Sequence, residues 1–202
     1  MTNNDVLRRL RYTFNLKDQQ VVNICALAAR TVNVAQVQKW LLKDDDTNMV
    51  PMSDAELASF LNGFIIEKRG RKDGQRPVAE TELNKNLILL KLKIALKLQN
   101  EDIITLLASA GFTVGKAELS AFFRKADHKN YRHCKSQFLR NFLQALQNKF
   151  RQNTPSKNHK GGKTVTGKKS PSAKQHFVNP KLAADSKTSG RKVLKLKPED
   201  IY

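Results

Sequence analysis

The feature that most constrains the fold is an internal repeat with an offset of 82 residues. Sliding the sequence on itself by this offset, without a gap, aligns many identical residues. Among the identical pairs are Leu7/Leu89, Leu10/Leu92, Leu16/Leu98, Ala26/Ala108, Thr31/Thr113, Phe60/Phe142 and Leu61/Leu143. The period is longer than the roughly 20 to 50 residues of solenoid repeats. It therefore predicts a duplicated domain, packed about a local two-fold axis, rather than an open array.

Each copy has the pattern of four helices. In the first copy, the apolar residues Val6, Leu7, Leu10 and Phe14 recur at helical spacing. We expect Asp18 to cap the second helix, Asn33 to lie at the turn before the third, and Ser53 with Glu56 to form a capping box for the fourth. In the second copy, Asn100 is the expected cap and Gly111 the expected end of the second helix. No segment alternates like a strand, so the predicted fold is all-α.

Composition divides the chain into four parts. The predicted helical domains cover residues 1–69 and 84–151, and residues 70–83 form a linker rich in glycine and charge. Residues 152–202 contain few large apolar side chains and hold 12 Lys and Arg against 3 Asp and Glu. We expect this basic tail to be disordered, because it cannot bury enough apolar surface to offset the entropy of ordering.

The net charge of +19 makes nucleic acid the leading partner class. No secretory leader is expected, because Arg8, Arg9 and Arg11 interrupt the first apolar segment. The apolar runs are also too short for a membrane span. The two cysteines, Cys25 and Cys134, suit neither a disulfide scaffold nor a structural zinc site. These features predict a cytoplasmic protein with no cofactor.

Two segments have the compactness of helix-turn-helix units, Asp18 to Leu42 and Asn100 to Arg124. The polar residues of their second helices are candidates for contacts with bases or phosphates. These candidates are Gln36, Gln38 and Lys39 in the first copy, and Lys116, Ser120, Arg124 and Lys125 in the second. An ordinary pair of packed helices explains the same pattern at least as well.

Basic helix faces are a second candidate for phosphate binding, with salt-sensitive affinity and little sequence preference. The residues are Arg8, Arg9 and Arg11 in the first copy and Lys91, Lys93 and Lys97 at the equivalent helix. Lys68, Arg69, Lys129, Arg132 and, in the tail, Lys168, Lys169, Arg191 and Lys192 complete the predicted set. The alternative is a set of solvated helix faces, which is what runs of charge usually are.

The segment Asp127 to Cys134 gathers an acid, imidazoles, a thiol and cations. A thiolate beside cations and histidine is a possible nucleophile, and His with Cys can bind zinc. The equivalent segment of the first copy keeps only Asp45 and Asn48 of this set. We therefore favour a role in shaping the loop for the shared residues.

Three strings closely resemble the bacterial YehS family, which is built from two copies of the domain of unknown function 1456. They are Asn-Asp-Val-Leu-Arg at residues 4–8, Phe-Leu-Asn-Gly-Phe-Ile-Ile-Glu-Lys-Arg-Gly at 60–70, and Asp-His-Lys-Asn-Tyr-Arg at 127–132. The resemblance covers residues 1–151 and leaves out the tail. It implies a cytosolic bacterial protein with a duplicated helical domain, and it brings no activity, cofactor or substrate.

The residues themselves favour a non-enzymatic protein that binds the phosphate backbone of RNA or DNA through basic helices and the tail. The second hypothesis is a helical adaptor for a protein partner, with the basic residues serving solubility or an acidic partner. A thiol- or metal-dependent enzyme using the segment Asp127 to Cys134 is the third.

Overall fold

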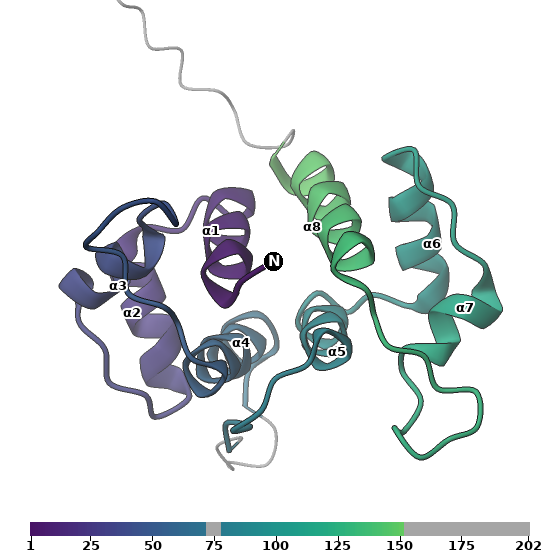
Figure 1. Cartoon of the computed structure of the whole chain (residues 1–202), viewed down its shortest axis with the longest axis horizontal. Helices are drawn as coiled ribbons and strands as arrows, with labels where there is room; N and C mark the ends of the chain where they lie inside the picture. Colours follow the sequence, from purple (N-terminus) through teal and green to yellow (C-terminus); the bar gives the residue numbers. More distant parts are fainter. Residues whose placement is uncertain (72–77, 152–202) are drawn as a thin grey trace, which may run out of the picture. The chain divides into compact units, whose positions relative to one another are not determined.

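The computed structural model describes residues 1–71 and 78–151, and these form eight helices (Figure 1). The predicted all-helical duplication is confirmed, because each helix of the second copy starts 82 residues after its counterpart in the first. The helices are α1 (Asn3–Thr13), α2 (Asp18–Leu27), α3 (Val34–Leu41), α4 (Asp54–Arg69), α5 (Lys85–Ala95), α6 (Asn100–Ser109), α7 (Lys116–Ala121) and α8 (Ser136–Arg151). Only α7 ends earlier than its counterpart.

The predicted capping box of α4 is confirmed, and Asn33, expected at the turn before α3, caps that helix. The Asn33 side chain accepts a hydrogen bond from the backbone of Gln36, and Ser53 and Glu56 form the reciprocal capping box. The helices α1, α2, α5 and α6 end where the backbone turns left-handed, and the repeat extends to these residues. After α1 and α5, the equivalent residues Asn15 and Lys97 have φ of +51° and +54°. After α2 and α6, Ala29 has φ of +60°, and the equivalent Gly111, the expected end of its helix, has φ of +82°.

The predicted caps of α2 and α6 are wrong. Asp18 and Asn100 are the first residues inside these helices, not the residues that precede them. The backbone N–H of Lys17 is bonded instead by the side chain of Gln20, at 2.8 Å, and the N–H of Gln99 by that of Asp102, at 2.7 Å. Asp18 and Asn100 are thereby free to bind cations of the preceding helix.

Glycine permits an unusually close approach of α2 and α4 in the first copy. A Cβ atom at Gly63 would lie 1.8 Å from the backbone oxygen of Ile24. The equivalent residue in α8 is Ala145, which is fully buried against the second copy's core. The two copies therefore differ in how tightly this pair of helices packs.

The two copies contact each other reciprocally: α4 packs against α5, and α8 packs against α1 (Figure 1). Arg69 donates to the backbone oxygen of Ile94 at 3.2 Å, and its equivalent Arg151 donates to the oxygen of Tyr12 at 2.6 Å. Tyr12 and Ile94 are themselves equivalent. Contacts that map onto one another in this way are those of a local two-fold axis.

The described end of the linker is fixed to α4. Asn62 donates to the oxygen of Val78 at 3.3 Å, and the backbone N–H of Leu83 donates to Asp54 at 2.9 Å. The other linker residues, 72–77, and the predicted tail, 152–202, lie outside the described residues. Within the described part of the chain, every helix is too short or too polar to cross a membrane.

Candidate nucleic-acid interface

A buried asparagine holds the segment before the last helix of each copy. Asn86 donates to the backbone oxygens of Phe122 and Arg132 at 2.9 and 2.8 Å, and its side-chain oxygen accepts from the N–H of Cys134 at 2.9 Å. Asn4 makes the same three bonds to the equivalent residues Trp40, Val50 and Met52, each at 2.9 Å. Residues 42–53 and 124–135 therefore run over one common frame.

Both segments close an inner turn in the same way. The carboxylate of Asp46 accepts from the backbone N–H of Asn48 at 2.9 Å, and Nδ1 of His128 accepts from that of Asn130 at 3.0 Å. The sequence predicts that the residues shared by the two segments, Asp45 and Asn48 in the first copy, bond their own backbone. The accepting side chains, however, belong to Asp46 and His128 rather than to the shared Asp45 and Asp127.

The charges on this common frame are opposite. Residues 42–53, here named the acidic loop, contain three aspartates and one lysine. Residues 124–135, here named the basic loop, contain five cations and one aspartate. The five cations are Arg124, Lys125, Lys129, Arg132 and Lys135.

The cations of the basic loop face solvent and make no ion pair within the described residues. Arg124 is half-buried, and the other four are exposed. A hollow of about 480 Å³ is lined by Arg124, Lys129, Tyr131 and Arg132, with Glu118 as its acidic side chain. A second hollow of about 210 Å³ shares Arg124 and Tyr131 with it. The loop thus offers unneutralised positive charge beside an aromatic ring, as phosphate and base binding require.

The thiol of the predicted catalytic segment lies in the core. Cys134 is equivalent to Met52, is 5% exposed, and its backbone N–H is bonded to Asn86. Burial raises the pKa of the Cys134 thiol to about 11. The thiol is therefore protonated at neutral pH and is not an activated nucleophile. Across residues 1–71 and 78–151, no three His, Cys, Asp or Glu side chains gather as metal ligands.

Several of the predicted cations are already bonded to other side chains of the protein. Arg8 pairs with Asp5 and Asp44 at 2.6 and 2.7 Å. Arg11 pairs with Asp18 at 2.8 Å, and the equivalent Lys93 donates to Asn100 at 2.5 Å. Lys116 pairs with Glu101 at 2.9 Å.

The prediction that Lys91 belongs to an exposed basic face is wrong. Lys91 is 8% exposed at the contact of α4 with α5, where it pairs with Glu80 at 2.7 Å and donates to Asn62 at 2.5 Å. Glu80 comes from the linker, and Asn62 comes from the first copy. Sequence periodicity could not show this burial, because the contact joins the two copies.

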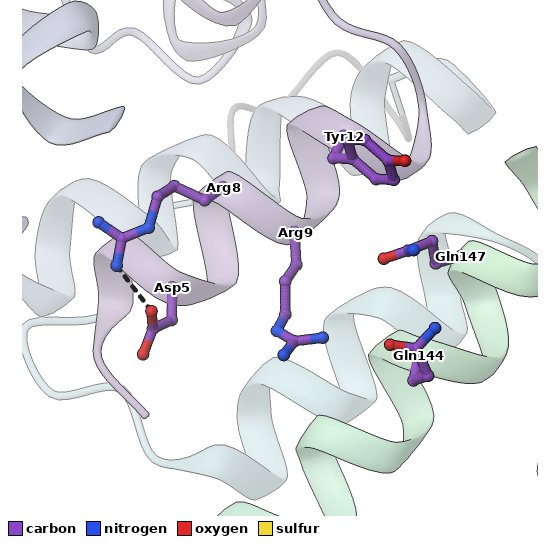
Figure 2. Close-up of a pocket in the computed structure, with 6 residues that line it drawn as sticks. All are labelled: Asp5, Arg8, Arg9, Tyr12, Gln144 and Gln147. Carbon is purple, nitrogen blue, oxygen red and sulfur yellow. Dashed lines mark hydrogen bonds and ion pairs between the residues drawn. The ribbon is translucent and has the colours of Figure 1, made fainter. Parts of the chain in front are cut away.

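Arg9, the equivalent of Lys91, has a different environment at the contact of α1 with α8. It extends toward Gln144 and Gln147 in an open hollow of about 450 Å³, with Asp5, Arg8 and Tyr12 around it (Figure 2). Asp5 is already paired with Arg8, which, with the backbone of Thr2, lowers the pKa of Asp5 despite its partial burial. Within the described residues Arg9 has no ion-pair partner, so it adds positive charge to this face.

Three of the predicted helix-turn-helix contacts, Gln36, Gln38 and Lys116, are bonded to neighbouring side chains. Gln36 donates to Glu56 at 3.4 Å and Gln38 to Asp18 at 3.5 Å, while Lys39 is exposed. In the second copy, α7 has only 6 residues, and Arg124 and Lys125 follow it in the basic loop. These placements do not favour base reading by α3 or α7 in the major groove.

The remaining predicted cations lie apart from the basic loop. Lys68 stands over the rings of Phe14 and Phe64 at 5.4 Å, and Arg69 binds the oxygen of Ile94. Lys97 is exposed at the left-handed end of α5. Lys168, Lys169, Arg191 and Lys192 lie outside the described residues.

The structure brings together four of the predicted residues, Arg124, Lys125, Lys129 and Arg132, and adds Tyr131 and Lys135, which sequence reasoning missed as binding residues. Counting the charged residues of each copy separately would have pointed to the second copy. Residues 84–151 hold 13 Lys and Arg against 4 Asp and Glu, whereas residues 1–69 hold 9 against 8. The excess charge of the described domains thus belongs to the second copy.

Comparison with known proteins agrees with the duplicated fold. The model of a family described as a protein of unknown function, DUF1456, matches residues 3–70 and again residues 85–152. The chain belongs to this family and carries its domain in two tandem copies. It is 42% identical over 148 residues to the uncharacterized protein YehS of Escherichia coli strain K12, a match that covers 72% of the chain and 94% of the relative. No solved structure matches the chain significantly.

Proposed function

We propose that the protein is a non-enzymatic nucleic-acid-binding protein whose basic loop, residues 124–135, holds the phosphate backbone of RNA or DNA. The observation that carries this proposal is the contrast between the loops. One asparagine-held frame presents three aspartates in the first copy and five cations in the second. The cations have no ion-pair partner among the described residues, so an external anion can neutralise them.

Counterion release supplies the free energy of such binding. Each cation that meets a phosphate displaces a condensed counterion, so affinity should fall steeply as salt is raised. The frame keeps the five cations on one short segment, which suits consecutive phosphates of a strand. The basic tail, including Lys168, Lys169, Arg191 and Lys192, would add further affinity without sequence preference. We place this binding in the cytoplasm, as the two unpaired cysteines predict.

The test compares two variants of the full chain that lose the same charge. The first neutralises the basic loop through Arg124→Gln, Lys125→Gln, Lys129→Gln, Arg132→Gln and Lys135→Gln. The matched control neutralises five exposed cations elsewhere, through Lys17→Gln, Lys39→Gln, Lys43→Gln, Lys97→Gln and Arg140→Gln. Fluorescence anisotropy with a labelled RNA and a labelled DNA would be followed across a salt titration.

The loop variant should bind on the order of 100-fold more weakly at moderate salt and show a flatter salt dependence, because it lacks up to five phosphate contacts. The control should change affinity only a few-fold. Equal losses in both variants would contradict a site at the loop. Wild-type protein that binds neither probe, but retains one stoichiometric protein partner after nuclease treatment, would favour the adaptor instead.

A further inference from the structure

In the first copy, Arg8 fills the space between α1 and the start of the acidic loop. Its guanidinium donates to the backbone oxygen of Leu42 and pairs with Asp5 and Asp44. The Arg8 side chain is 23% exposed, so its charged end covers this corner of the domain. The corner is polar and occupied.

The second copy replaces all three side chains of this network by apolar ones. Leu87, Leu90 and Ala126 stand at the positions of Asp5, Arg8 and Asp44. None of these side chains can form a hydrogen bond or an ion pair, and they line the 210 Å³ hollow instead. The second copy thus has a hollow at the place where the first copy has an ion-pair network.

The walls of this hollow combine apolar surface with positive charge. Phe122, Phe123 and Tyr131 add aromatic side chains to the two leucines, and Arg124 and Lys125 stand in the lining. Phe122 is held by Phe138, with ring centroids 4.7 Å apart, and Tyr131 by His133 at 5.0 Å. Two of the three aromatic rings of the hollow, those of Phe122 and Tyr131, thus contact another ring.

The size and chemistry of the hollow define its occupant. Its volume lies below the roughly 300 to 1,000 Å³ of pockets for drug-sized ligands, so it suits a single flat ring system. An apolar, aromatic slot with cations beside it matches a base that remains joined to its phosphate. A base in a duplex is stacked and paired, whereas a base in a single strand is free to leave the stack.

We propose that this hollow receives one unpaired base of a single-stranded nucleic acid, while Arg124 and Lys125 hold the adjoining phosphate. The inference rests on the proposed function and deepens it, because it selects single strands over duplexes. Phosphate contacts alone would bind both forms. The hollow adds a contact that only an unpaired base can make.

The test restores the network of the first copy in the second. The double variant Leu90→Arg with Ala126→Asp leaves the net charge unchanged and recreates the pair that Arg8 forms with Asp44. A second variant, Ala126→Leu, fills the hollow with an apolar side chain. The matched control, Arg8→Leu with Asp44→Ala, makes the reverse exchange in the first copy. The probes are a labelled single strand, the same strand with abasic sugars, and a duplex, and thermal melts establish that each variant is folded.

Wild-type protein should prefer the single strand with bases over both other probes. Both hollow-filling variants should lose about tenfold in affinity for that probe, the loss expected when one stacked base is removed. Their affinity for the abasic strand and the duplex should stay within twofold, and the control should behave as wild type.

Unchanged single-strand affinity in both filled variants would overturn the inference, even if neutralising the basic loop abolishes binding. If the filled variants keep their single-strand affinity and the neutralised basic loop binds none of the three probes, this inference fails and the proposed function stands. Tighter binding of an apolar peptide than of the single strand at the hollow would also overturn the inference of a base site.

Discussion

The two copies share their internal frame and differ in what they present to solvent. The frame is built on Asn4 and Asn86, which make the same three bonds to the chain before the last helix of each copy. The acidic and basic loops rest on that frame with opposite charge. Frame residues satisfy buried backbone groups and cannot change cheaply, whereas solvent-facing positions can. The differences between the copies are therefore the place to look for function.

The largest expected effect tests a difference in packing. Gly63→Ala should destabilise the protein by about 3 kcal/mol, because the new Cβ atom meets the backbone oxygen of Ile24 and α2 must move away from α4. The reverse exchange in the second copy, Ala145→Gly, should cost only about 1 kcal/mol, mainly through helix propensity. Urea unfolding of both variants measures the two values. Equal costs would mean that the copies pack alike.

The next prediction tests the sameness of the frame. Asn4→Ala and Asn86→Ala should each cost about 2 kcal/mol, because each leaves two backbone oxygens and one N–H without their side-chain partner. Only Asn86→Ala should also weaken nucleic-acid binding, because it alone releases the basic loop. Calorimetry and anisotropy on the same samples separate the two effects. A binding defect in Asn4→Ala would break the contrast between the loops.

A smaller effect distinguishes the two contacts between the copies. Lys91→Met should cost about 1 to 2 kcal/mol, because it leaves the carboxylate of Glu80 and the amide oxygen of Asn62 without their cation. The equivalent Arg9→Met should cost less than about 0.5 kcal/mol, since Arg9 has no ion-pair partner within the described residues. Chemical denaturation of the pair provides the comparison. A larger loss of unfolding free energy for Arg9→Met would show that Arg9 stabilises the contact of α1 with α8.

The smallest effect concerns the left-handed residues that follow α2 and α6. Ala29→Gly should stabilise the first copy by about 0.5 to 1 kcal/mol, because φ is +60° there, and Gly111→Ala should destabilise the second by a similar amount. The shift in thermal midpoint should have opposite signs for the two variants. Shifts of the same sign would contradict the equivalence of these helix ends.

Hydrophobic periodicity and the 82-residue offset were sufficient to predict the helices. The preferences of residue types for capping positions did not locate the first residues of α2 and α6. Asp18 and Asn100 are good capping residues, but Gln20 and Asp102 reach back to the residues before them and shift the caps by one position. The capping rules rank residue types, and they do not decide between two adjacent positions that can both be capped. The left-handed end at Gly111 was predictable because glycine alone marks it, while Ala29 carries no such signal.

The candidate site was only partly predictable, for a different physical reason. Sequence showed the cations, and it could not show which of them are neutralised by distant partners. Arg8 pairs with Asp44, which lies 36 residues away, and Lys91 pairs with Glu80 of the linker. Removing such paired residues leaves the basic loop as the unneutralised cluster. Asn4 and Asn86 escaped notice as loop anchors because a buried asparagine looks like any polar helix residue until its partners are known.

The reciprocal contacts between the copies bear on how each half of the protein can diverge in sequence. An assembly of two identical chains with these contacts would carry every substitution twice, so an aspartate-rich loop on one half would be matched by an aspartate-rich loop on the other. Joining the two halves in one polypeptide removes that constraint while keeping the symmetric contacts of α1 with α8 and α4 with α5. The first half can then keep the ion pairs of Arg8 with Asp5 and Asp44, while the second half has the hollow lined by Leu87, Leu90 and Ala126 at the same place.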